Sequence, residues 1–199
     1  NMADFFEQFK QPAWLMKDGQ MYGVPYGWGI IRIIADAKAV DPNTDSLAFL
    51  WDPKYAGKIS MWDDIETVYT AGRLLGVKDV YNMTDEELEK VKAKLIEMKP
   101  NIRKYWFTTG EMGTLMTGNE VVAGNSWEST LVELRKAGRD IVDIKPKEGR
   151  GGWSDSWMIV KGAETNPCVY QWLNWVSSPK AQALAHGVTG FGYSNMKLA

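Results

Sequence analysis

Segments with strand and helix character alternate along the chain, and this order constrains the fold more than any other feature of the sequence. Short apolar runs indicate strands, and amphipathic segments between them indicate helices. The alternation is typical of α/β proteins, in which helices cover a sheet. Ligands of such proteins usually bind beyond the carboxyl ends of the strands. We therefore predict an α/β fold and look for a site where strands end.

Helix boundaries are predicted from capping residues and from glycines. The clearest helix is "MTDEELEKVKAKLIEMKP", where Thr84 and Glu87 form a capping box and Leu88, Val91 and Leu95 form a buried stripe. Further predicted N-caps are Asp63, Ser126, Asn166 and Ser178, and further helix ends are Gly76, Gly138 and Gly187. In the helix after Asn166, the periodicity predicts that Trp172 and Trp175 lie in the core.

Composition excludes several classes of function. The 199 residues have a net charge of -2 and no basic block, so we expect no nucleic-acid partner. No apolar run reaches the roughly 18 residues that span a membrane. The single cysteine, Cys168, and the single histidine, His186, favour neither a disulfide nor a metal site nor a nucleophile. The opening residues resemble the middle of a protein, so we expect an export signal upstream.

Tryptophan is the outlier of the composition, with ten copies. In "GRGGWSDSWMIV", the GRGG residues read as a flexible approach to a strand that places Trp153, Asp155 and Trp157 on one face. Indoles beside a carboxylate suit a cation, although the same alternation also fits a half-buried structural strand. We expect Trp157 to pack inside the protein. The tryptophans beside glycines or carboxylates are Trp28, Trp62, Trp127 and Trp153.

Two aspartates follow a predicted strand at "MWDD". Asp63 with Glu66 fits a helix N-cap, which leaves Asp64 as the freer carboxylate. Asp64 and Asp155 could also form the carboxylate pair of a glycoside hydrolase. We keep that enzyme as an alternative from another class.

Five segments occur in the order seen in periplasmic polyamine-binding proteins, the spermidine and putrescine receptors of ABC importers, and the chain resembles that family over most of its length. The segments are "MYGVPYGWG", "LWDPKYAGKISMWDD", "GNEVVAGNSWES", "PKEGRGGWSDSWMIV" and "SSPKAQALAHGVTGFGYSN". The resemblance implies a type II periplasmic binding fold, with two α/β lobes joined by hinge strands and the first lobe incomplete in this chain. It divides the chain into a remnant of the first lobe with the first hinge (1–27), the second α/β lobe (28–152), the return to the first lobe (153–190), and a segment crossing back toward the second lobe (191–199).

The resemblance also implies the binding residues. Trp127, Trp153 and Asp155 match positions that sandwich a polyamine and neutralise an ammonium group, and Asp64 matches another carboxylate. The complete predicted set is Trp127, Trp153, Asp155, Asp64, Trp28, Trp62 and Phe191. Three positions depart from the family pattern: Thr67 replaces an acid, Glu66 replaces an arginine and Phe191 replaces a tyrosine.

We therefore expect a monomeric solute receptor of the periplasm that binds a polyamine or related cationic amine between its lobes. Its partners would be this cationic solute and a membrane permease, with no cofactor, no metal and no catalysed reaction. The same fold could instead carry an opine, an aminophosphonate, a quaternary amine or a sugar. An anionic group would require an arginine or a helix N-terminus at the site, and Arg150 is the candidate near the predicted site.

Overall fold

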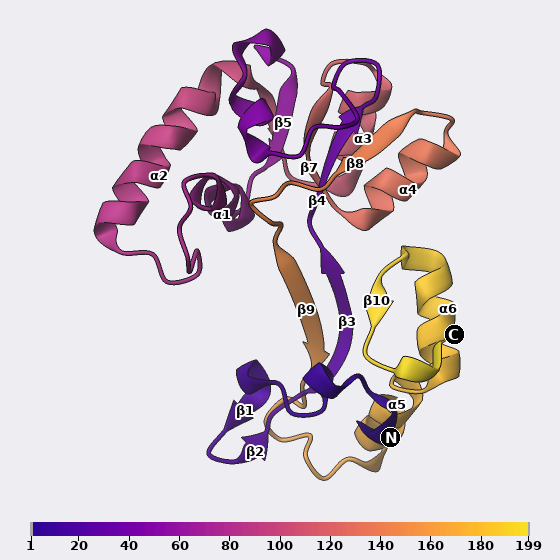
Figure 1. The fold of residues 1–199 in the computed structure, drawn as a ribbon. Coiled ribbons are helices and arrows are strands. Elements are labelled where there is room, and N and C mark those ends of the chain that lie inside the picture. Colours follow the sequence, from indigo (N-terminus) through magenta and orange to yellow (C-terminus); the bar gives the residue numbers. More distant parts are fainter. Residues whose placement is uncertain (1, 199) are drawn as a thin grey trace. The chain divides into compact units, whose positions relative to one another are not determined.

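A computed structural model describes residues 2–198, and the chain folds into two compact units. Unit 1 consists of Asn1–Gly29 and Gly152–Ala199, and unit 2 consists of Ile30–Gly151. The chain therefore passes between the units twice, after Gly29 and after Gly151 (Figure 1). No helix within residues 2–198 is both long enough and apolar enough to cross a membrane.

Unit 2 is built on a five-stranded mixed sheet in the order β6-β5-β7-β4-β8. Strands β5, β6 and β7 run parallel, and β4 is antiparallel to both β7 and β8. The strands are β4 (Arg32–Asp36), β5 (Ile59–Trp62), β6 (Ile102–Trp106), β7 (Ala123–Ser126) and β8 (Ile141–Ile144). Between them lie α1 (Ile65–Leu74), α2 (Asp85–Met98), α3 (Thr109–Thr117), α4 (Glu128–Lys136) and the 3₁₀ turns Leu47–Trp51, Pro53–Tyr55 and Lys99–Asn101. The alternation of strands and helices confirms the predicted α/β class.

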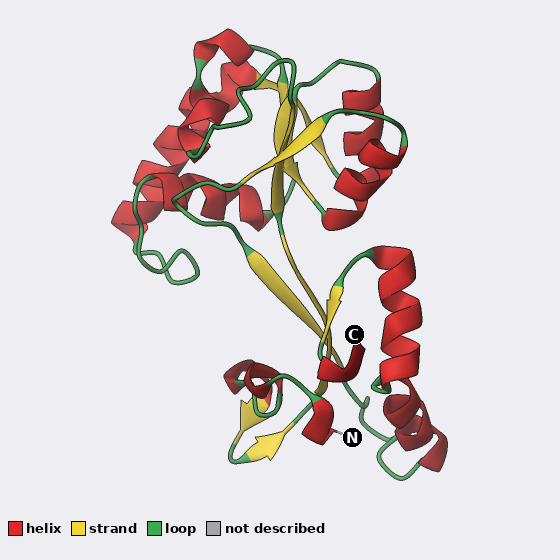
Figure 2. Cartoon of the chain, turned by 45° about the vertical axis from the view of Figure 1, so that its right-hand side comes forward, coloured by secondary structure: helices red, strands yellow, loops and turns green. Residues whose placement is uncertain are grey.

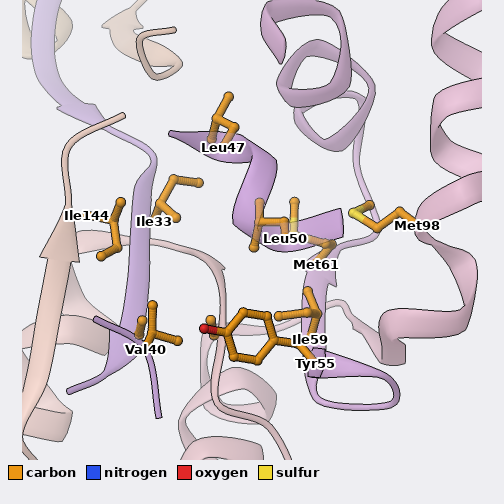
Figure 3. Close-up of a cluster of buried hydrophobic side chains, with 11 residues drawn as sticks. Ile33, Val40, Leu47, Leu50, Tyr55, Ile59, Met61, Met98 and Ile144 are labelled. Atoms are coloured by element: carbon orange, nitrogen blue, oxygen red, sulfur yellow. The ribbon is translucent and has the colours of Figure 1, made fainter. Parts of the chain in front are cut away.

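Each face of this sheet has its own apolar core. Successive residues of a strand point to opposite faces, so Ile33 belongs to one core and Ile34 to the other. The first core packs Leu50 and Met98 against the sheet (Figure 3). The second core packs side chains of α3 and α4, and Trp62 and Trp127 lie at its border. Figure 1 shows α1 and α2 on one side of the strands and α3 and α4 on the other.

Most helix boundaries of unit 2 follow the local signals, with corrections to two N-caps and to one buried stripe. The capping box of α2 forms as predicted, and Gly76 and Gly138 adopt the left-handed conformation after their helices. The N-cap of α1 is Asp64 and not Asp63, since the Asp64 side chain accepts the bond from the Glu66 amide. The N-cap of α4 is Trp127, because β7 continues through Ser126. In α2, Val91 is buried but Leu88 is 41% exposed, so the predicted stripe is narrower.

Unit 1 contains two small sheets and two helices (Figure 2). A three-stranded sheet has the order β10-β3-β9, and a hairpin pairs β1 with β2. The elements are β1 (Met16–Lys17), β2 (Gln20–Met21), β3 (Val24–Ile30), β9 (Gly152–Trp157), α5 (Pro167–Val176), α6 (Pro179–Thr189) and β10 (Gly192–Tyr193), with 3₁₀ turns at Met2–Asp4, Glu7–Phe9, Ala13–Leu15 and Met196–Leu198.

Ser194 and Asn195, near the C-terminus, form buried hydrogen bonds with other residues of unit 1. Gln182 of α6 donates to Ser194 at 3.2 Å and accepts from the Asn195 amide at 2.9 Å. Ser194 donates to the carbonyl of Pro25 at 2.8 Å. Residues 192–197 therefore pack within unit 1, and for these residues this corrects the expected crossing toward the second lobe.

The apolar face of α5 differs from the prediction. Trp172 and Trp175 are 48% and 53% exposed, although Val176 of the same helix is buried. Helical periodicity identifies an apolar stripe, but burial depends on which other elements lie over it, and the described residues leave these two rings open to solvent. The predicted helix end at Gly187 is also wrong, because Gly187 lies inside α6. The helix ends at Thr189, and its C-cap is Gly190, which adopts the left-handed conformation.

Candidate functional site

The motifs "MWDD" and "NSW", which contain Trp62 and Trp127, meet at one edge of the sheet of unit 2. Trp62 is the last residue of β5, and Trp127 directly follows β7. Because β5 and β7 are parallel neighbours, their carboxyl ends lie on the same side. The rings of Trp62 and Trp127 are 5.4 Å apart at 70°. The structure therefore brings these two tryptophans into contact within unit 2.

Two residues that the sequence interpretation missed complete this aromatic cluster. Trp106, at the end of β6, stacks on Trp62 with centroids 5.3 Å apart and planes 4° apart. Asn125 accepts from the Trp62 amide at 2.7 Å through its side chain, and its carbonyl accepts from the Trp106 indole at 3.2 Å. Trp106 and Asn125 are buried and hold Trp62 in place, and the half-buried Trp62 ring in turn contacts Trp127. Their position at strand ends was the signal that could have found them.

Asp63 and Asp64 are both exposed beside this cluster. The Asp64 Oδ1 atom accepts from the Glu66 amide at 3.0 Å, which stabilises the first turn of α1. Neither carboxylate forms an ion pair with a residue of the described chain. Asp64 is therefore both a helix cap and a negative charge at the edge where β5 ends.

Two of the three positions that depart from the family pattern are buried in unit 2. The Thr67 hydroxyl donates to the Trp62 carbonyl at 2.5 Å. Glu66 pairs with Arg73 at 2.6 Å, and both side chains are 10% exposed. Burial raises the pKa of the Glu66 carboxyl, while the nearby Arg73 guanidinium and the Gly151 amide oppose that rise. Neither Glu66 nor Thr67 presents a free carboxylate at the surface.

The arginine that could have recognised an anion is already paired. Arg150 lies 2.6 Å from Asp143, and its side chain is 14% exposed. On the other oxygen of Asp143, Arg32 binds at 2.7 Å. The carbonyl of Gly151 also accepts from the Ile31 amide at 2.9 Å. The GRGG segment is thus held more firmly at its unit 2 end than its glycine content predicts.

In unit 1, Trp153 lies against a glycine of the neighbouring strand. A Cβ atom built at Gly29 would come within 2.6 Å of the Trp153 ring, and Gly27 also faces this ring. The Phe191 ring meets Trp153 edge-on, with centroids 4.8 Å apart at 78°. The two glycines of β3 therefore make room for an indole that the strand itself could not otherwise accommodate.

Asp155 lies two residues along β9 from Trp153 and is exposed. It borders a cavity of about 540 Å³ within unit 1, whose aromatic lining is Tyr26, Trp157, Trp172, Trp175, Phe191 and Tyr193. Trp157 contacts Tyr26 and Trp172 edge-on but remains 38% exposed, so it is less buried than predicted. Asp155 forms no ion pair with any residue between 2 and 198.

Trp28 is separated from this group by the geometry of its strand. Gly27 and Gly29 face Trp153, so the intervening Trp28 points to the opposite face of β3. Its indole donates to the Tyr193 carbonyl at 3.1 Å and packs over Gly192 and beside Phe9. The sequence grouped Trp28 with Trp153, and the structure does not bring the two rings to one face.

Metal binding has no candidate site in the described part of the chain. Residues 2–198 contain no group of three or more His, Cys, Asp or Glu side chains able to hold a metal ion. Cys168 is exposed at the start of α5, and the His186 ring bonds the Phe191 carbonyl at 2.7 Å.

Comparison with solved structures defines the class of protein. The spermidine/putrescine ABC transporter substrate-binding protein of Streptococcus pneumoniae aligns with 98% of this chain at a TM-score of 0.82 and 21% identity, and this chain covers 59% of it. The binding protein MotA of A. tumefaciens B6, solved in complex with glucopine, aligns with the whole chain at a TM-score of 0.78 and 22% identity, with 60% of MotA covered. The fold is that of α/β periplasmic binding proteins, as predicted.

The sequence comparison then gives the family. Residues 1–199 match the family described as bacterial extracellular solute-binding protein, and the chain belongs to that family. A relative, the spermidine/putrescine-binding periplasmic protein of Escherichia coli (strain K12), is 30% identical over 178 residues, or 88% of this chain. The chain spans about half the length of the curated relatives it matches. Because this is a family of binding proteins and not of enzymes, the glycoside hydrolase hypothesis is set aside.

Proposed function

We propose that this chain is part of a solute receptor of an ABC importer that binds a small organic cation of the putrescine and spermidine class. The observation that carries the proposal is that each unit combines an exposed carboxylate, unpaired among the described residues, with a partly exposed indole. In unit 1 these are Asp155 and Trp153 on β9, and in unit 2 they are Asp64 and Trp127 at the strand ends. The name of the Escherichia coli relative supports the same ligand class.

The chemistry of these groups suits alkyl ammonium ions. A cation over an indole face gains about 0.5–2 kcal/mol, and a hydrogen bond to a charged group contributes about 1.5–3 kcal/mol. Trp62 adds apolar ring surface on unit 2 and Phe191 adds it on unit 1, and such surface suits the methylene groups of an alkyl amine. The proposal excludes Trp28, which faces away from Trp153.

The buried state of Glu66 and Thr67 favours a short diamine. We assign one exposed carboxylate of unit 2, Asp64, to the ligand, because Glu66 is paired with Arg73 and the Thr67 hydroxyl is bonded to the Trp62 carbonyl. We therefore propose that one ammonium group is neutralised on unit 2 and that putrescine is preferred over spermidine.

An anionic or zwitterionic ligand such as an opine is the second candidate, because MotA shares the fold. Recognition of a carboxylate or phosphate would use an available guanidinium or a helix N-terminus. Arg32 and Arg150, which lie beside this edge of unit 2, are both engaged by Asp143. This pairing favours the amine over the opine.

The cellular setting of the proposal follows the family. A receptor of this kind acts in the periplasm as a monomer, delivers its solute to a membrane permease, and carries an export signal upstream of its first lobe. These partners and this location are proposals for the whole protein.

Calorimetric titration with putrescine and spermidine tests the function, using protein freed of co-purified ligand by unfolding and refolding. We expect one putrescine per chain, with affinity lowered about tenfold or more by Asp155→Asn and by Trp153→Ala. Asp18→Asn is the control, since Asp18 is an exposed residue in the turn between β1 and β2 of unit 1. Two independent sites per chain, or no heat with either amine, would overturn the proposal.

A further inference from the structure

Arg32 connects three parts of unit 2 beside the aromatic cluster. It is the first residue of β4, and its backbone pairs with Ser126, the residue before Trp127. Its guanidinium binds the carboxylates of both Glu128 and Asp143. The three side chains are between 13% and 23% exposed, so these are largely desolvated charges.

Glu128 is the link between this arginine and Trp127. It is the first residue of α4, whose N-cap is Trp127 itself, and no side chain caps this helix. A carboxylate in the first turn is favoured by the helix dipole. Here the Glu128 carboxylate is also held by the Nε and Nη2 atoms of Arg32. The backbone that carries the Trp127 indole is therefore anchored by an ion pair and not by a capping hydroxyl or carboxylate.

The fork geometry of Arg32 matters for this anchor. The Nε and Nη2 atoms of Arg32 bind Glu128, and its Nη1 atom donates to one oxygen of Asp143. The other oxygen of Asp143 accepts from Arg150. Lysine would keep the charge but offers one nitrogen in place of the planar fork, so it could not hold both carboxylates in the same way. With both carboxylates on Arg32 satisfied internally, neither of them is a ligand group for a cation.

We propose that Arg32 is a positioning residue, which sets the orientation of the Trp127 indole through Glu128 and thereby tunes the affinity of the proposed amine site. The ligand readout of this inference rests on the proposed function, whereas the ring orientation can be measured without ligand. Binding residues generally need support that keeps them within about 0.5 Å of the productive geometry.

The structure offers a matched control at the other end of the same strand. Asp36, the last residue of β4, pairs with Arg139 at 2.9 Å, with side chains 16% and 21% exposed. Arg139→Lys therefore weakens an ion pair of similar burial on the same sheet, remote from Trp127. Glu128→Gln is a second test variant, because it retains a hydrogen-bond acceptor while removing the charge that Arg32 holds.

The experiment compares Arg32→Lys, Glu128→Gln and Arg139→Lys in three measurements: urea unfolding, near-ultraviolet circular dichroism without ligand, and putrescine titration. We expect similar losses of stability for the two lysine variants. Arg32→Lys and Glu128→Gln should reduce the tryptophan band that Trp127→Phe removes, and should weaken putrescine binding about tenfold. Arg139→Lys should leave both the band and the binding unchanged.

The outcomes separate this inference from the proposed function. If Arg32→Lys and Arg139→Lys give the same dichroism spectrum, Arg32 only stabilises the fold and the inference is wrong, whatever binds. If the spectrum changes as expected but unmutated protein does not bind putrescine, the positioning role stands and the amine assignment fails.

Discussion

The indole of Trp153 lies against the Cα of Gly29 so closely that a Cβ at position 29 would approach the ring to 2.6 Å. A substitution at Gly29 therefore acts on the orientation of an indole carried by another strand, within the sheet of unit 1. Gly29 is needed for this close approach and not for an unusual backbone angle, since it is absent from the glycines with positive φ.

Gly29→Ala should displace the Trp153 ring and destabilise unit 1 by about 1–3 kcal/mol, the usual cost of overpacking. Binding of putrescine should weaken as well. The control is Gly187→Ala, inside α6, where an added Cβ meets nothing within 4 Å; it should stabilise by about 0.5–1 kcal/mol. Urea unfolding checks both, and a neutral Gly29→Ala would show that the Trp153 ring is placed elsewhere in solution.

Asp64 has two roles that different substitutions separate. Asp64→Ala removes the cap of α1 and should cost about 0.5–2 kcal/mol of stability. Asp64→Asn keeps a good N-cap and removes the charge, so stability should hold while putrescine affinity falls. Asp63→Asn, at the exposed neighbour that caps no helix, serves as the control. Equal affinity in Asp64→Asn and unmutated protein would remove Asp64 from the site.

The α3 cap should make stability depend on pH. Glu111 bonds Lys104 at 2.7 Å and the amides of Phe107 and Thr108, and these contacts lower the pKa of its carboxyl to about 2. A depressed folded-state pKa stabilises the protein above the ordinary value of 4.5, and this contribution is lost as the pH falls toward about 2.

Glu111→Gln should therefore lower the melting temperature at pH 7, and the difference from unmutated protein should narrow steadily between pH 4.5 and pH 2. Thermal melts across this range check the prediction. Glu133→Gln, at an exposed position in α4, is the control and should change the melting temperature at pH 7 only slightly. A constant difference for Glu111→Gln would mean that its carboxylate is not held by these bonds.

Replacing Trp106, at the end of β6, and Trp172, on α5, should lower stability by different amounts, because the two side chains differ in burial. Trp106 is 1% exposed, and Trp106→Ala should cost about 3–5 kcal/mol. Trp172 is 48% exposed, so Trp172→Ala should cost less than half as much, and iodide should quench its emission. Equal costs for the two substitutions would indicate that Trp172 is covered in solution, which a concentration series of sedimentation runs would test.

Several features of this protein were determined by the sequence itself. The capping box at Thr84 and Glu87, the N-caps Asn166 and Ser178, and the alternation of strands and helices all formed as predicted. These features depend on contacts between residues a few positions apart, so local chemistry decides them. The family resemblance likewise rested on short segments and was confirmed by the family match.

Only the tertiary structure decided which side chains share a surface. Trp28 and Trp153 were grouped by residue type, but strand pairing puts them on opposite faces of β3. Trp106 and Asn125 join Trp62 because three strands end at one edge, and Arg150 is unavailable because Asp143 of another strand binds it. Burial, pairing and accessibility depend on residues distant in the chain, whereas periodicity and capping report only the immediate neighbours of each residue.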